Sequence, residues 1–312
     1  MNISTNTKTP HIEQVAENLF LITLNPEMRG FENFIGVWLY KGKINFIVDV
    51  GPSATAPGLI KALESMGIAE LDYILLTHVH IDHAGGIGEV AAFFDQTPIV
   101  CHQAGIRHLV KPARLWEASV KTLGPVAQAY GPMKGVDEKR FVDAESFRSE
   151  MIASILTPGH SPHHVSFLTG PFLFAGEAGG VSLSVSPDHH YLRPATPPKF
   201  FLETNVKSIE AMIDREPEMI CYSHFGIKDD AAGMLLKHKK QIYQWENIIR
   251  DELESSPKKN CIPDCLNLLL QHDKNLAGFF AMAQPTQERE CGFLINSIRG
   301  FIGYFESLTN NP

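Results

Sequence analysis

Cysteines and long apolar runs are both scarce in this sequence, and each shortage argues against a class of protein. The five cysteines are an odd number without the regular spacing of a disulfide framework, so we expect a reducing compartment. No stretch approaches the roughly 18 consecutive apolar residues that a membrane-spanning helix needs. The first residues, MNISTNTKTPHIEQ, lack the apolar core of a signal peptide. We therefore expect a cytoplasmic protein that does not enter a membrane.

Positive charge is also in short supply. The 312 residues include 27 Lys and Arg against 35 Asp and Glu, a net charge of −8. The whole excess lies in residues 1–233, with 18 basic and 26 acidic side chains, whereas residues 234–312 have nine of each. Because an acidic domain repels phosphate backbones, we expect a small-molecule substrate and no nucleic-acid partner.

Hydrophobic periodicity predicts an α/β domain in the first two-thirds of the chain. Hydrophobic residues make up 44% of the sequence, enough for a sizeable core, and we find no internal repeat. Short β-rich runs predict strands at 19–24, 36–40, 45–50, 73–77, 153–157, 165–168, 172–175 and 219–222. Helical patterns cover 56–67, 203–214 and, in pieces, 103–130. Residues 187–201, rich in proline and aromatic side chains, are expected to form a loop.

The last part of the chain has a different pattern, in which two helical stripes gather apolar side chains on one face each. The first stripe contains Leu235, Ile242, Trp245, Ile249 and Leu253, and the second contains Leu294, Ile295, Ile298, Phe301, Ile302, Phe305 and Leu308. Such helices need a partner surface, so we expect them to pack on the first domain or to join two subunits into a homodimer. The predicted domains are residues 1–233 and a helical extension, residues 234–312.

The most informative stretch is Thr77-His78-Val79-His80-Ile81-Asp82-His83-Ala84-Gly85-Gly86, at the end of an apolar strand. Imidazole and carboxylate groups suit Zn²⁺, iron or Mn²⁺. Residues two apart point the same way as a strand ends, so His78 and His80 are expected to bind one ion. Asp82 and His83, on the turn beyond, are expected to face a second ion. The two glycines permit a tight turn behind this site.

This stretch resembles the first metal-binding motif of the metallo-β-lactamase superfamily, and the resemblance extends along the first two-thirds of the chain. Residues 47–51, IVDVG, look like the family's strand-ending Asp-x-Gly, which implies that Asp49 supports a metal ligand without binding metal itself. Residues 157–164, TPGHSPHH, look like its TPGHTPGH segment, which implies that His160 is a ligand and His164 a supporting neighbour. His224, after a buried strand, is similar to the family's last ligand.

The resemblance also implies a fold. Members of this superfamily are αββα sandwiches, so we expect that architecture for residues 1–233, with the C-terminal helices as an extension. In the family, the loop that follows the strand equivalent to residues 172–175 borders the substrate cleft. By this resemblance His190, Tyr191 and Arg193 are candidate substrate contacts, and a solvated polar loop is the alternative interpretation.

One position departs from the family pattern. Where the family usually has Gly-Asp, with the aspartate bridging both metals, this sequence has Gly176-Glu177. Glutamate is also an oxygen ligand, but its extra methylene moves the carboxylate further from the backbone. We expect Glu177 to bind metal, either as the bridge or at one ion only. The alternative is that Glu177 lies beside a mononuclear site and does not bind the metal.

The expected activity is hydrolysis. Two divalent ions, zinc first with iron or manganese as alternatives, would provide a metal-bound hydroxide for attack on an ester-like bond, with Asp82 as the catalytic residue that orients it and accepts a proton. The layout looks most like the glyoxalase-II-like and thioesterase branch, which implies a thioester or a related small-molecule ester or lactone as substrate. Two other functions stay open: a mononuclear iron oxidoreductase of the persulfide-dioxygenase type, and a metal-binding ligand sensor with little turnover.

Overall fold

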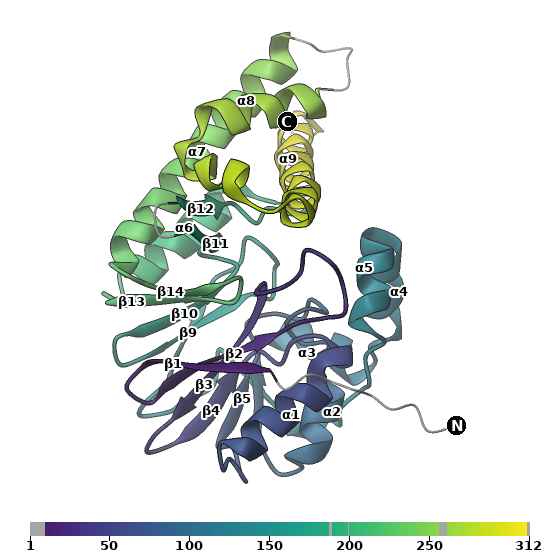
Figure 1. Ribbon diagram of the computed structural model, residues 1–312, viewed down its shortest axis with the longest axis vertical. Helices are drawn as coiled ribbons and strands as arrows, with labels where there is room; N and C mark the ends of the chain where they lie inside the picture. The colour runs from purple at the N-terminus through teal and green to yellow at the C-terminus, as the bar shows by residue number, and fades with distance from the viewer. Residues whose placement is uncertain (1–9, 187–188, 199, 256–260, 311–312) are drawn as a thin grey trace. The chain divides into compact units, whose positions relative to one another are not determined.

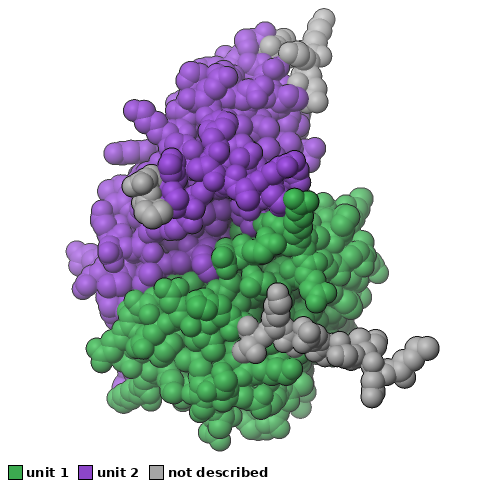
Figure 2. Space-filling model, viewed as in Figure 1, with its two compact units in different colours: residues 1–147 green, residues 148–312 purple. Residues whose placement is uncertain are grey.

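The computed structural model describes residues 10–186, 189–198, 200–255 and 261–310. Contacts divide the chain into two compact units, residues 1–147 and 148–312 (Figure 2). The predicted domain boundary between residues 233 and 234 is a different division of the chain and stays a prediction. Within the described ranges, no helix is both long and apolar enough to cross a membrane.

A seven-stranded mixed sheet is the core of the first unit, and its strands lie in sequence order (Figure 1). The strands are β1 (His11–Ala16), β2 (Leu19–Leu24), β3 (Ile35–Lys41), β4 (Asn45–Val48), β5 (Tyr73–Leu75), β6 (Ile99–Cys101) and β7 (Phe141–Asp143). The helices are α1 (Ala56–Ser65), α2 (Ile87–Phe93), α3 (Gln103–Val110), α4 (Ala113–Leu123) and α5 (Pro125–Tyr130), with short 3-10 turns η1 (Ser53–Thr55) and η2 (Glu138–Arg140). Strands β1 to β4 pair antiparallel, whereas β4 to β7 pair parallel.

The parallel part of this sheet brings two sequence motifs together. Strands β4 and β5 are short and largely buried, as expected for parallel strands in the interior of a sheet. Val48 pairs with Leu75, and the backbone N–H of Asp49 donates to the carbonyl of Leu75 (2.8 Å). Because parallel strands end at the same edge, Asp49 and the histidine segment that begins at Thr77 leave the sheet side by side.

The second unit contains a five-stranded sheet, a hairpin and the C-terminal helices (Figure 1). The sheet has the order β14 (Gly226–Asp229), β13 (Met219–Tyr222), β10 (Phe172–Gly176), β9 (Val165–Thr169) and β8 (Ala153–Leu156). The hairpin pairs β11 (Val181–Ser186) with β12 (His189–Arg193). The helices are α6 (Leu202–Ile213), α7 (Ala231–Ser255), α8 (Ile262–His272), the 3-10 helix η3 (Lys274–Ala281) and α9 (Gln284–Asn310).

The first apolar stripe is largely buried, and the second is buried in part. The fully buried members are Leu235, Ile242, Trp245 and Ile249 of α7 and Leu294, Ile298 and Phe301 of α9. Helices α7, α8 and α9 contact one another, and α7 also contacts α6 and β12. Leu308, at the end of the second stripe, is 56% exposed, so the stripe is not covered over its whole length. The homodimer stays a prediction.

The predicted loop at 187–201 was wrong in part, because its residues 189–193 form strand β12. This strand pairs with β11, with Leu183 opposite Tyr191. Its last three residues, Tyr191, Leu192 and Arg193, are all buried. Polar and apolar side chains therefore do not alternate, which removes the usual sequence signal of a strand.

A buried ion cluster joins β12 to α9. Nε of Arg193 donates to one carboxylate oxygen of Glu290 (2.6 Å), and Nε of Arg289 donates to the other (2.9 Å). The three side chains are at most 8% exposed. Burial by itself raises the pKa of Glu290, but the charges of Arg193 and Arg289 outweigh burial and hold this pKa below its usual range. Glu290 is therefore ionised in the folded protein at neutral pH.

We predict that Glu290→Gln lowers the free energy of unfolding by about 3–5 kcal/mol, because two buried guanidinium groups lose their counter-charge. The folded-state pKa of Glu290 is depressed, so its contribution is complete at neutral pH and disappears as the pH falls through that lowered value. Urea titrations of variant and wild type should therefore converge in acid. Glu288→Gln, at an exposed position of α9, is the control and should change stability by less than about 0.5 kcal/mol. Equal losses in the two variants would contradict this role.

Candidate metal centre

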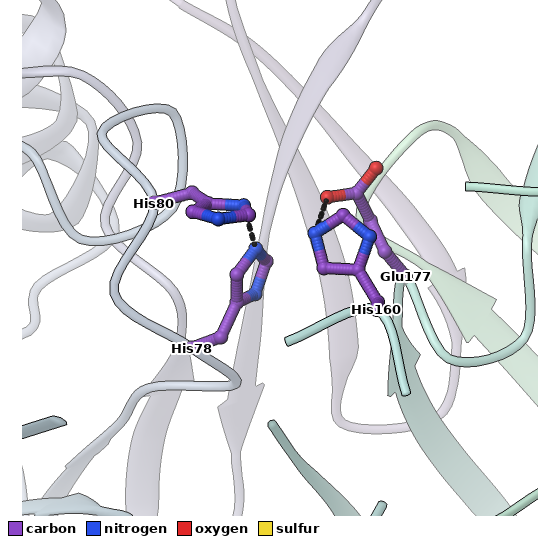
Figure 3. Close-up of side chains that lie close together, drawn as sticks. All are labelled: His78, His80, His160 and Glu177. Carbon is purple, nitrogen blue, oxygen red and sulfur yellow. Dashed lines mark hydrogen bonds and ion pairs between the residues drawn. The ribbon is translucent and has the colours of Figure 1, made fainter. Parts of the chain in front are cut away.

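The first pair of donors lies directly after β5. His78 is 1% exposed, and its Nε2 lies 2.9 Å from Nδ1 of His80 (Figure 3). The two imidazoles therefore present ring nitrogens to one point, as expected for residues two apart at a strand end.

Thr77 determines which nitrogen of His78 carries the proton. The Thr77 hydroxyl lies 2.9 Å from both carboxylate oxygens of Asp49, and a carboxylate only accepts, so the hydroxyl donates to Asp49. Nδ1 of His78, 3.0 Å from the same hydroxyl, must then donate to it. This leaves Nε2 of His78 with a lone pair, which is the state that a metal ligand needs.

Asp49 holds His83 as well. Its Oδ2 accepts from Nδ1 of His83 (2.8 Å), and its Oδ1 accepts from the backbone N–H of Thr77 (2.8 Å). The carboxylate is buried, with 2% of Asp49 exposed. A buried carboxylate on the far nitrogen of an imidazole is the usual way in which proteins orient a metal-binding histidine. These contacts give Asp49 the means to act in the supporting role that the resemblance implies.

Asp82 lies on the turn between the histidines. Its side chain is 18% exposed, and its Oδ2 is 3.8 Å from Nε2 of His83. The backbone N–H of His83 donates to the carbonyl of His80 (3.0 Å), which closes the turn. A Cβ at Gly85 would overlap the carbonyl oxygen of Ile81, so the turn requires glycine there. Asp82 and His83 form a second donor pair in the first unit.

In the second unit, His160 and Glu177 form a further pair (Figure 3). Nε2 of His160 lies 2.9 Å from Oε2 of Glu177, and the two residues are 7% and 9% exposed. Nδ1 of His160 lies 2.9 Å from the carbonyl oxygen of Ala195, which can only accept, so Nδ1 carries a proton. A neutral imidazole in this state offers a lone pair at Nε2. A cation shared with the Glu177 carboxylate would satisfy both groups, so this pair fits a metal ion.

His164 acts on the backbone of Glu177. The N–H of Glu177 donates to Nε2 of His164 (3.1 Å), so Nδ1 of His164 carries the proton and donates to the hydroxyl of Thr157 (2.8 Å). His164 is 0% exposed. Both of its ring nitrogens are engaged, which suits support of a ligand better than ligation.

His224 follows β13 by two residues and is 2% exposed. Its carbonyl accepts from the backbone N–H of Ser182 (2.8 Å), and the N–H of Phe225 donates to the carbonyl of Ser182 (2.9 Å). These bonds to the start of β11 fix the backbone that carries the His224 imidazole.

Proximity of their ligand atoms distinguishes the donors from the other acids and histidines of the described residues. Within the described residues, the groups of His, Cys, Asp and Glu that could hold a metal ion contain His78, His80, Asp82, His83, His160, Glu177 and His224 and no others. All seven are predicted ligands. Their ligation itself stays a prediction.

The three predicted substrate contacts lie in different environments. His190 is exposed, whereas Tyr191 and Arg193 are 0% and 2% exposed. Burial, with a smaller contribution from Glu290, raises the pKa of Tyr191, and Arg193 is paired with that same Glu290. The structure thus gives Arg193 a charged partner on α9. Substrate contact stays a prediction for all three.

Sequence reasoning missed two groups that hold the histidines. Thr77 directly precedes His78 and follows a strand that neighbours the one ending at Asp49. This position could have indicated that its hydroxyl contacts both residues. The carbonyl of Ala195 gives no sequence signal, because every residue has a carbonyl and this one lies 35 residues from His160.

Comparisons with known proteins agree with these features. Residues 33–224, more than half of the chain, match the family described as the metallo-beta-lactamase superfamily. The metallo-beta-lactamase fold-containing protein ST1585 of Sulfurisphaera tokodaii is 28% identical over 189 residues, which are 57% of this chain and 69% of the relative. A hydroxyacylglutathione hydrolase of Pectobacterium atrosepticum is 28% identical over 142 residues, 45% of each protein.

Solved structures share the fold. The crystal structure of ST1585 from Sulfolobus tokodaii matches with a TM-score of 0.69 and 23% identity, over 91% of this chain and 98% of that one. The predicted fold, of the αββα type with a C-terminal helical extension, is confirmed by this likeness and by the family match. The chain belongs to the metallo-β-lactamase superfamily.

Proposed function

We propose that this protein is a metal-dependent hydrolase that holds two divalent ions and acts on a small thioester or a related ester. The proposal rests on the close approach of paired donor atoms within each unit. Paired donor atoms face one another at 2.9 Å, in His78 with His80 and in His160 with Glu177. Thr77 and the carbonyl of Ala195 hold the far sides of the His78 and His160 rings, which is typical of metal-binding histidines.

In the proposed assignment the first ion takes His78, His80 and His160, and the second takes Asp82, His83 and His224. Glu177 would help to hold both ions or the first alone. Five imidazoles and two carboxylates suit zinc first, and iron or manganese next. The two acids also offset the repulsion between adjacent dications, which is strong in a partly dry site.

The bound ions would lower the pKa of a water molecule towards neutrality and polarise the substrate carbonyl. Asp82 would orient that water and accept its proton, since its carboxylate lies beside His83 and is more exposed than that of Glu177 (18% against 11%). Val79 and Ile81, both buried, alternate with the donors and keep water from the back of the segment. The chain thus supplies three imidazoles in fixed tautomers, His78, His83 and His160, and one acid for proton transfer.

The thioester substrate is supported by the hydroxyacylglutathione hydrolases among the relatives, whose matches cover 45% of their own length. The layout of the family motifs favours the same glyoxalase-II-like branch.

The test begins with elemental analysis of protein purified without added metal, followed by a panel of acyl-glutathione and acyl-coenzyme A thioesters, simple esters and lactones. We expect about two transition-metal ions per chain and release of free thiol from at least one thioester. One iron per chain, with oxygen consumption on a persulfide and no thioester cleavage, would replace the hydrolase by an oxidoreductase. Bound metal without turnover of any of these compounds would favour a sensor.

A further inference from the structure

We infer that helix α9 positions the metal ligand His160, acting through residues 193–197, which we call the strap. The inference rests on the proposed function, because it treats His160 as a ligand. It goes beyond that function because α9 spans Gln284–Asn310, outside residues 33–224 that match the family. His160, the strap and α9 all belong to the second unit.

The strap sets the orientation of the His160 ring. Its Ala195 carbonyl accepts a hydrogen bond from the N–H of Nδ1 (2.9 Å), and this contact leaves Nε2 facing Glu177. Ala195 is 6% exposed, so water has little access to its surroundings. If the strap moved, His160 would lose the group that fixes both its tautomer and its ring plane.

Ser297 of α9 ties the strap on both sides of Ala195. Its hydroxyl donates to the carbonyl of Pro194 (3.1 Å) and accepts from the backbone N–H of Thr196 (3.4 Å). Its backbone carbonyl accepts from the hydroxyl of Thr196 (3.2 Å). Ser297 and Thr196 are 2% and 1% exposed. A single residue of the helix therefore holds the two neighbours of the carbonyl that His160 uses.

Gly300 lets α9 approach the strap closely. A Cβ at this position would overlap the carbonyl oxygen of Thr196 and would lie 2.9 Å from that of Pro197. Both obstacles are backbone atoms, so the strap or the helix would have to shift. One turn away, Gly303 has nothing within 4 Å of the same added atom. The helix therefore contains a matched pair of glycines, one against the strap and one in open space.

The experiment compares Gly300→Ala with Gly303→Ala. Both variants add one methyl group to α9 and gain the same helix propensity, so only the contact with the strap differs. Two properties would be measured. Competition with a chelating dye gives the zinc affinity, and visible spectroscopy gives the absorption of the cobalt-substituted protein. Gly300→Ala should bind zinc about 10–100-fold more weakly and show a changed cobalt spectrum. Gly303→Ala should match the wild type in both.

A second pair of variants provides the test if Gly300→Ala does not fold. Ser297→Ala removes the hydroxyl that ties the strap, whereas Ser307→Ala removes one that bonds only to the carbonyl of Tyr304 in its own helix. The first should weaken zinc binding and alter the cobalt spectrum, and the second should do neither.

The outcomes separate the two proposals. Wild-type metal affinity and spectra in Gly300→Ala and Ser297→Ala would overturn the positioning role while leaving the metal-dependent hydrolase intact. Absence of metal binding by the wild type would overturn the proposed function, and the inference with it. Loss of stability without any spectral change in the folded fraction would mean that the strap is structural only, which also overturns the inference.

Discussion

His80→Ala and Asp82→Ala are each expected to lower the metal content and to reduce hydrolysis by at least about 100-fold. In His80→Ala, Nε2 of His78 keeps its lone pair through Thr77 but loses the imidazole that faces it at 2.9 Å. In Asp82→Ala, the donor beside His83 and the proposed proton acceptor disappear together. Elemental analysis and a thiol-release assay measure the two effects on the same samples.

Two further variants make these results specific. Asp82→Asn keeps the shape of the side chain and removes its charge, so it should behave like Asp82→Ala if the carboxylate matters. His272→Ala changes an exposed histidine at the end of α8 and should leave metal content and turnover unchanged. Full metal loading with full turnover in Asp82→Ala would show that the proposed ligands of the second ion are wrong.

Glu177→Gln is expected to lose the second ion and most activity, whereas Glu177→Asp should keep two ions and partial activity. The reason is charge: a bridging carboxylate offsets the repulsion of two neighbouring dications, and an amide does not. Gln is otherwise well tolerated here, because its amide nitrogen can donate to Nε2 of His160, and the backbone N–H of residue 177 still bonds to His164. A lower metal content in this variant would therefore not reflect a lost fold.

Metal stoichiometry of both variants is read by elemental analysis and paired with hydrolysis of an acyl-glutathione. Glu218→Gln, which removes an exposed acid of the same unit, is the control for net charge and should equal the wild type. If Glu177→Gln retains as much metal as the wild type, Glu177 is not a ligand, and a mononuclear or bridge-free site becomes the better description.

Much of the fold could be predicted because its signals are local. Strands β4 and β5, whose ends lead to Asp49 and Thr77, are short and largely apolar runs, and each was predicted within two residues of its end. The donor segment from His78 to His83 is contiguous in the sequence, so its chemistry is visible without a structure. The apolar stripe on α7 could likewise be predicted from helical periodicity, because it packs against apolar side chains and needs no particular residue as partner.

The rest depends on contacts between residues far apart in the sequence. The carboxylate partner of Arg193 is Glu290, 97 residues later, and no local pattern links the two. Strands β6 and β7 have three residues each, too few for a period of two to be visible. The ties of Ser297 to Pro194 and Thr196 involve backbone groups that every residue has. A sequence shows which side chains are present, but much of the support of this site comes from backbone groups, which no sequence pattern marks.

The order in which these contacts become available during synthesis follows from their spacing. Asp49 lies 34 residues from His83, so the support of the first unit's donors can form early. The strap can bond to Ser297 only about a hundred residues after Pro194 has been made. At roughly 5–20 residues per second, tens of seconds or less separate the two events on the ribosome. We expect the donors of the first unit to be supported well before Ser297 can tie the strap beside His160, so that the site matures in two steps.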